Sequence, residues 1–159
     1  MMRKWFGLIG GFGVAAWLLY AAWPQTRIEV VLPQQRCYLA GQDFTLQWRH
    51  SVEHQLWQEH YRLDGRQLWL DATYMQTFGA GTPSGGQPLL APPGFIGQRS
   101  QVRLPELNWV VSRRAENRIH THQSNWALYL LVPDYTEIHI RPVRQPRGQQ
   151  WLGAECHEQ

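Results

Sequence analysis

The stretch FTLQWRHSVEHQLWQEHYRLDG, residues 44–65, decides the fold class of this chain. Apolar residues occupy every second position of its first half, which is the period of a strand with one face in a core. The second half repeats this alternation from Trp57 to Leu63, and Asp64-Gly65 then gives a strong signal for a tight hairpin turn. The pattern predicts two antiparallel strands that lead into a third strand at residues 67–75.

The register expected for these strands brings a histidine opposite a carboxylate on the inner face. With a loop of residues 53–56, Trp57 faces Val52, and His50 faces Glu59. A buried carboxylate without a partner is costly, and an imidazole opposite it is a suitable partner. The inner face of the meander then carries Trp48, His50, Trp57, Glu59, Tyr61 and Leu70.

Three interpretations of this face stay open from the sequence. His50 and Glu59 could form a polar pair that locks the strand register beneath an aromatic core. They could instead form the floor of a ligand-binding pocket whose walls are Trp48, Trp57 and Tyr61. In the third interpretation they act as an acid/base pair, although no serine or cysteine nucleophile stands beside them in a recognisable elbow.

The rest of the chain predicts an all-β fold. Short runs rich in β-branched and aromatic residues occur at 27–33, 37–40, 67–75, 100–111, 125–132 and 136–143, with no sustained helical period. They favour an antiparallel β-sandwich or open barrel over residues 27–145. The run 125–132 is apolar on both faces and predicts a central strand, residues 79–97 predict a long loop, and residues 146–159 form a polar tail.

The N-terminus predicts a helix that crosses a membrane. The basic pair Arg3-Lys4 precedes an uncharged run, Trp5–Trp23, which is close to the roughly 20 residues that span a bilayer. Large side chains at residues 20 and 23 disrupt a small-residue cleavage site, so we favour an uncleaved signal-anchor over residues 1–26. The basic head favours the cytoplasmic side, which places the β domain outside.

Cysteine content and charge limit the classes of function that are open to this protein. Cys37 and Cys156, from the first part of the β domain and from the tail, are expected to form a disulfide in an oxidising compartment. The net charge of +3 comes from scattered arginines, which gives no footprint for nucleic acid. We expect no cofactor.

Two further groups of residues are candidates for a site. Glu53, at the hairpin tip, is either solvated or caps backbone N–H groups of a neighbouring loop. Gly79 and Gly81 permit close backbone approach, and a structural turn is favoured there over an anion-binding nest. Three histidines offer a zinc site with an open position, against the simpler interpretation that they lie on the surface: His120, His122 and His139.

The order of these residues resembles a known bacterial family. Trp48, His50-Ser51-Val52-Glu53, Trp57, Glu59, Tyr61 and then Gly79-Ala80-Gly81 with Pro83 are similar to the family named domain of unknown function 1850. The resemblance covers residues 37–83. It implies small exported or membrane-attached proteins, often encoded beside or fused to the large membrane subunit of TAXI-type tripartite ATP-independent periplasmic (TRAP) transporters, and it implies no activity.

The expected function is therefore a non-catalytic accessory domain. It would be anchored by a single pass in the bacterial inner membrane, face the periplasm and bind the membrane subunit of a TAXI-type TRAP transporter. The alternatives are a module that binds a small carboxylate solute, and an envelope hydrolase that uses His50 and Glu59 or a histidine-ligated zinc. The residues expected to contact a ligand or partner are Trp48, His50, Glu53, Trp57, Glu59, Tyr61, Gly79 and Gly81.

Overall fold

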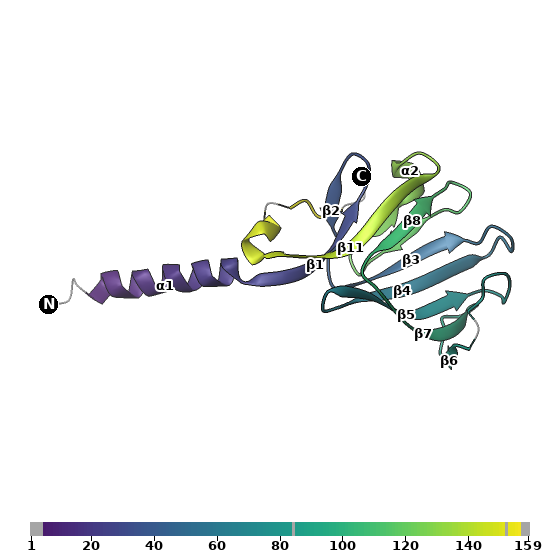
Figure 1. The fold of residues 1–159 in the computed structure, drawn as a ribbon, viewed down its shortest axis with the longest axis horizontal. Helices are drawn as coiled ribbons and strands as arrows, with labels where there is room; N and C mark the ends of the chain where they lie inside the picture. The colour runs from purple at the N-terminus through teal and green to yellow at the C-terminus, as the bar shows by residue number, and fades with distance from the viewer. Residues whose placement is uncertain (1–4, 84, 152, 157–159) are drawn as a thin grey trace.

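The computed structural model describes residues 5–83, 85–151 and 153–156, and it consists of a helix followed by two β-sheets (Figure 1). The elements are α1 (Trp5–Ala22), β1 (Pro24–Val31), β2 (Arg36–Tyr38), β3 (Asp43–Arg49), β4 (Leu56–Asp64), β5 (Gln67–Met75), β6 (Gln87–Leu89), β7 (Ile96–Leu104), β8 (Leu107–Val111), β9 (Arg118–His120), β10 (Asn125–Ala127), α2 (Leu128–Leu131), β11 (Thr136–Pro146) and η2 (Arg147–Trp151).

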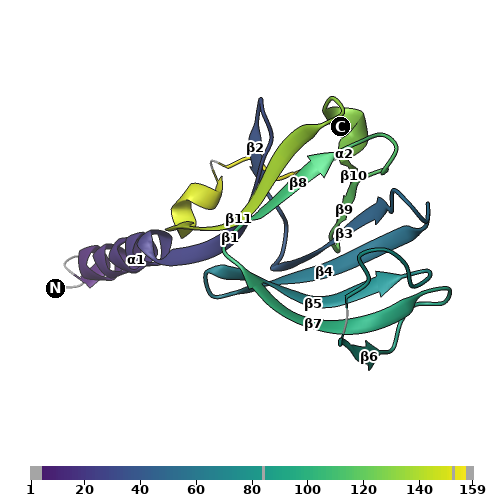
Figure 2. The same cartoon turned by 45° about the vertical axis from the view of Figure 1, so that its right-hand side comes forward.

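The two sheets are antiparallel and face one another, as Figure 2 shows. The smaller sheet has the strand order β2-β1-β11-β8, and the larger has the order β10-β9-β3-β4-β5-β7-β6. Fully buried side chains from both sheets form the core, among them Ile28, Phe44, Leu46, Ile119 and Ile138. The predicted all-β antiparallel class is confirmed, and of the two architectures left open, sandwich or open barrel, the two sheets correspond to the sandwich.

The meander of β3, β4 and β5 is present, but the first register is wrong. Trp57 pairs with Trp48 rather than with Val52, and Glu59 pairs with Leu46 rather than with His50. The chain turns earlier than expected because the His50 N–H donates to the Gln55 carbonyl at 2.8 Å, so residues 50–55 form the loop. The shift is an even number of residues, so the inner face keeps its apolar side chains.

The second turn and a bulge move Glu59 again. Gly65 and Arg66 form the two-residue connection, with Gly65 at φ +64°, and Asp64 pairs with Gln67. The pairing register between β4 and β5 then shifts at His60/Tyr61, as happens at a bulge. Glu59 consequently faces Thr73 across the pair of strands.

The apolar run at residues 125–132 is not the central strand that was predicted. It divides into the short strand β10 and the single helical turn α2. Leu128 is fully buried, whereas the Leu130 side chain is 67% exposed. An apolar run of this length fits a buried strand and a short helix equally well, and here the second conformation is adopted.

The disulfide predicted between Cys37 and Cys156 is confirmed. The tail also forms backbone bonds along β2: the Tyr38 N–H donates to the Ala154 carbonyl, and the Cys156 N–H donates to the Tyr38 carbonyl, both at 3.0 Å. These bonds and a bridge between Tyr38 and Glu155 cover the outer edge of β2.

The helix predicted at the N-terminus is present and projects from the sandwich (Figure 1). Its end is held by η2, where the Arg147 guanidinium lies 4.8 Å from the centre of the Tyr20 ring. Among the described residues, however, no helix reaches the length and apolarity of a membrane span, so the predicted transmembrane span is not supported.

Candidate functional site

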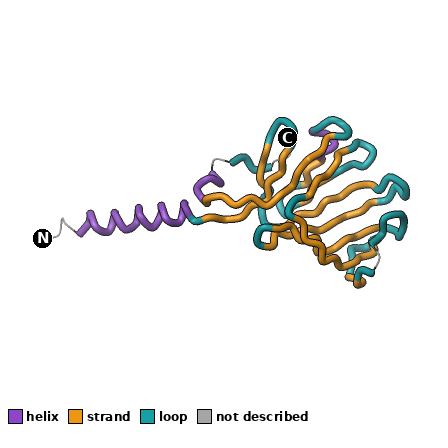
Figure 3. The backbone as a smooth tube through the Cα atoms, viewed as in Figure 1, coloured by secondary structure: helices purple, strands orange, loops and turns teal. Residues whose placement is uncertain are grey.

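Three connections meet at the end of the sandwich away from α1, and we call them the loop end. They are residues 50–55 between β3 and β4, residues 76–83 after β5, and residues 112–117 between β8 and β9. Figure 3 draws these loops in teal at the tips of the strands. Most of the residues predicted from the sequence to form a site lie in this loop end or directly beneath it.

Glu53 links the first two loops. The Ala80 N–H donates to its Oε1 at 2.8 Å, so the capping expected for this carboxylate is observed. Gly79 leaves the necessary room, because a Cβ at this position would lie 2.2 Å from Glu53 Oε1. The hydrogen bond from Ala80 is the main cause that lowers the pKa of Glu53, with burial acting in the opposite direction and the charge of His50 adding to the decrease.

His50 contacts Glu53 and not Glu59, so the predicted pair of His50 and Glu59 is wrong. Its Nδ1 contacts Glu53 Oε2, and its ring stacks on Trp57 with 4.9 Å between the centroids. The Val52 N–H also lies 3.3 Å from the same nitrogen. Because one nitrogen cannot donate and accept together, we assign a proton to Nδ1, which then donates to Glu53 Oε2.

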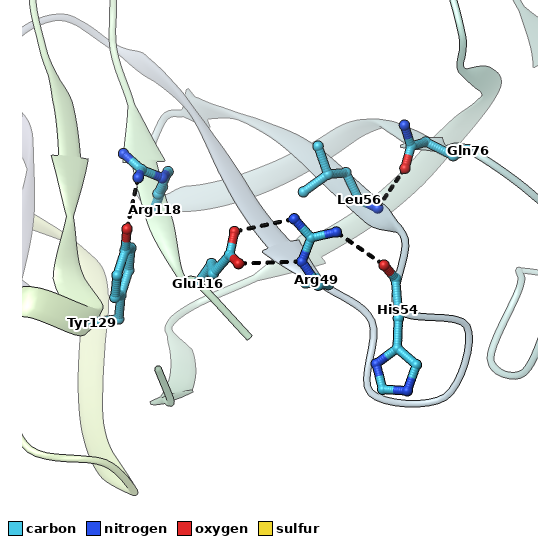
Figure 4. Close-up of polar contacts among 7 residues, drawn as sticks. All are labelled: Arg49, His54, Leu56, Gln76, Glu116, Arg118 and Tyr129. Atoms are coloured by element: carbon cyan, nitrogen blue, oxygen red, sulfur yellow. Dashed lines mark hydrogen bonds and ion pairs between the residues drawn. The ribbon is translucent and has the colours of Figure 1, made fainter. Parts of the chain in front are cut away.

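Arg49 connects the first loop to the third, as Figure 4 shows. Its Nε and Nη2 donate to the two carboxylate oxygens of Glu116 at 3.4 and 3.2 Å, and its Nη1 donates to the His54 carbonyl at 3.0 Å. In the same view the Leu56 N–H donates to Gln76 Oε1 at 2.9 Å. A guanidinium that donates two hydrogen bonds to one carboxylate fixes the orientation of the two side chains as well as the distance between them.

Sequence reasoning missed Arg49, Gln76 and Glu116 because nothing local marks them. Arg49 and Glu116 are 67 residues apart, and each alone resembles an ordinary surface charge. The one signal available was position, because Arg49 is the last residue of its strand and directly precedes the loop.

Aromatic rings support the loop end from below. Trp48 and Trp57 are cross-strand partners with centroids 6.1 Å apart, and Trp109 meets Trp48 edge-on at 6.1 Å. Tyr61, which was expected to wall the same pocket, lies further along β4 and stacks on Phe44 at 5.3 Å. The structure therefore brings Trp48, Trp57 and His50 together and separates them from Tyr61.

Glu59 lies on the inner face with Tyr61 as its hydrogen-bond partner. The Tyr61 hydroxyl donates to Glu59 Oε2 at 2.7 Å. Burial raises the pKa of Glu59, and the hydrogen bond from Tyr61 opposes part of that increase. Burial and the Glu59 charge likewise raise the pKa of Tyr61 far above its ordinary value. An acid/base pair of His50 and Glu59 is not formed.

The three histidines proposed for zinc are not brought together. His139, on β11 of the smaller sheet, lies 2.8 Å from Glu106 and 2.9 Å from Asn108, while His122 lies 3.3 Å from Asp43. His120 is on β9 of the other sheet, where burial and the charge of Arg118 lower its pKa. Within the described ranges, no three metal-ligating side chains form a group.

The loop end exposes apolar side chains to solvent. Val52 is 65% exposed in the first loop, and Phe78 is 60% exposed in the second. The Glu53–Ala80 hydrogen bond joins the two loops that carry them. Such a surface, with fixed loops and protruding apolar groups, is chemically suited to contact with another molecule.

Comparison with known proteins places the chain in a family. No curated protein and no solved structure matched the chain. The model of the family described as domain of unknown function (DUF1850) matches residues 44–128, from β3 to the first residue of α2. The resemblance predicted from the sequence covers residues 37–83; the matched range starts later, at residue 44, extends further, to residue 128, and includes all three loops of the loop end. The chain therefore belongs to the domain of unknown function 1850 family.

Proposed function

We propose that this protein is a non-catalytic, membrane-attached accessory domain of the bacterial periplasm that binds a TAXI-type TRAP transporter through its loop end. One observation carries the proposal. The bond from Ala80 to Glu53 joins the first two loops of the loop end, and each of these loops exposes a large apolar side chain, Val52 or Phe78.

Fixed loops favour binding because little conformational freedom is lost when a partner docks. Arg49 bonds to the His54 carbonyl and to Glu116, so the first loop is held from both sides. Exposed apolar groups supported in this way gain free energy when a partner removes them from water, at about 25 cal/mol per Å² of apolar surface.

Membrane attachment is proposed through α1. The part of the helix nearest the sandwich exposes a series of large apolar residues: Val14, Trp17, Leu18, Leu19 and Tyr20. Burial of such a surface in lipid is favourable, and tryptophan and tyrosine are enriched where a chain meets the membrane interface. Because the loop end lies at the opposite end of the molecule (Figure 1), attachment through α1 would leave it free for a partner.

The identity of the partner rests on what the family resemblance implies, which is an association with the membrane subunit of TAXI-type TRAP transporters. The test is affinity purification of the full chain from membranes of its own bacterium, with quantification of the co-purifying membrane subunit. The double variant Val52→Asp/Phe78→Asp should lose most of that subunit. Val110→Asp is the matched control, because Val110 is 53% exposed but lies on β8, outside the loop end.

Two results would contradict the proposal. The first is that the transporter subunit does not co-purify with the unaltered chain. The second is that the double variant recovers as much of the subunit as the Val110→Asp control does. Thermal unfolding of all three proteins shows whether a loss comes from the surface or from unfolding.

A further inference from the structure

The larger sheet ends in an edge that is only partly covered. The last strand, β6, pairs with β7 through three residues only, at Gly97, Gln98 and Arg99. From Ser100 to Leu104 the outer edge of β7 has no strand beside it among the described residues. Unpaired N–H and C=O groups along such an edge are a template for a further strand.

The chain leaves this edge open by turning away from it. If β6 were extended toward its N-terminus, Gly86 and Gly85 would lie beside Ser100 and Gln101. Instead Gly85 adopts φ +87°, and a cleft of about 430 Å³ lies between the loop and the edge. Its walls are Pro83 and residues 85–87 on one side and residues 98–102 of β7 on the other.

The cleft contains polar groups without partners. Thr73 lines it and is 1% exposed, and its hydroxyl has no hydrogen-bond partner in the described part of the chain. The Oε1 atom of Gln98, the cross-strand neighbour of Thr73, is also buried and unpartnered. Buried polar atoms are almost always paired, so Thr73 Oγ1 and Gln98 Oε1 are two acceptors that a group entering the cleft could satisfy.

We propose that the edge of β7 from Ser100 to Val102 accepts an extended segment of a partner protein as an additional strand in line with β6. The backbone of this segment pairs with β7, and an inward hydroxyl or amide side chain donates to Thr73 and Gln98. Arg99 also lines the cleft and is exposed, so an acidic side chain on the segment gains a charge partner. The inference rests on the proposed function, because it assigns the segment to the protein that the loop end binds.

The other edges of the two sheets are less suited to this role. The tail covers the edge of β2 through its bonds to Tyr38. β10 has three residues only. The edge of β8 is the nearest comparison, since it has five residues and carries the exposed Val110. It therefore provides the matched control.

The test places a lysine at an exposed valine on each of the two edges. Natural proteins use charged side chains on edge strands, lysine above all, to prevent edge pairing. Val102 lies opposite Leu70, within the open part of the β7 edge, and is 48% exposed, close to the exposure of Val110. Val102→Lys and Val110→Lys are each expressed as full chains in the native bacterium, and the co-purifying partner is quantified by mass spectrometry.

The expected result is that Val102→Lys lowers partner recovery at least about tenfold, a factor that corresponds to 1.4 kcal/mol, while Val110→Lys leaves it unchanged. Retention of the partner by Val102→Lys overturns the inference and leaves the proposed function standing. Failure of the unaltered chain to recover any polypeptide overturns both.

A second measurement is needed if Val102→Lys does not fold. A photoreactive benzoylphenylalanine in place of Gln101 should crosslink to a polypeptide in cells, whereas the same group in place of Val110 should not. Crosslinking at neither position, or at Val110 alone, overturns the inference. A hydrogen-exchange comparison of residues 98–104 with and without the partner then shows whether backbone amides of the edge become protected.

Discussion

Reduction of the Cys37–Cys156 disulfide should cost this domain a large part of its stability. The bridge joins residues separated by 119 positions, so it closes almost the whole β domain into one loop. In the chain-entropy relation for crosslinked unfolded chains, a loop of this length is worth about 5 kcal/mol at 25 °C. For a domain of this size, 1 kcal/mol shifts the melting temperature by about 2–4 °C, so reduction should lower it by about 10–20 °C.

The assay is urea and thermal unfolding of the full chain with and without a phosphine reductant. Cys156→Ser is the control, since it removes the bridge and leaves Cys37, which is 5% exposed in the core, in place. The variant should be as stable as the reduced wild-type chain and should not respond to the reductant. Amide exchange at Tyr38, whose N–H donates to the Ala154 carbonyl, reports whether the tail stays docked.

The reasoning would be refuted by a loss of less than about 1 kcal/mol on reduction, which is far below the value from loop closure. That result would mean that the bridge does not restrict the unfolded chain, and that the tail is held by its backbone bonds to β2. A reductant effect on Cys156→Ser would show that the measured shift does not come from the disulfide.

Three further predictions follow from single contacts. Gly79→Ala should lower the melting temperature of the wild-type chain but not that of Glu53→Ala, because the three atoms nearest the new Cβ all belong to the Glu53 side chain; equal losses in both backgrounds would contradict this. Glu59→Gln should flatten the pH dependence of stability. The raised pKa of Glu59 means that its contribution is fully present below the unfolded pKa and is lost as pH rises through the folded value, so melting curves of the two proteins should diverge above about pH 4. Asn117→Ala should cost about 1–3 kcal/mol in urea unfolding, because the Asn117 side chain is buried and accepts the Ser112 N–H at 2.8 Å; a change within 0.5 kcal/mol, the range of an ordinary surface substitution, would refute it.

The predicted site was partly assembled by the fold. Trp48, His50, Glu53, Trp57 and Gly79 do lie together, and the sequence brought them into view because they are close along the chain or on one strand face. Glu59 and Tyr61 form their own hydrogen-bonded pair further along β4. The mistake came from register, since periodicity defines which face a residue occupies but not which residue stands opposite it.

Fold class was determined by the sequence alone. Alternating apolar residues in 44–52 and 57–63 can bury one face only as strands, and this holds for any even shift in register. The disulfide was also predictable, since only two cysteines are present and they pair.

Tertiary structure alone decided how the loops are tied together and where the larger sheet stays open. The bond from Ala80 to Glu53 and the fork of Arg49 on Glu116 join residues 27 and 67 positions apart. The short pairing of β6 leaves the β7 edge uncovered. Contacts of this kind depend on the relative positions of separate strands and turns, and local sequence periodicity contains no information about those positions.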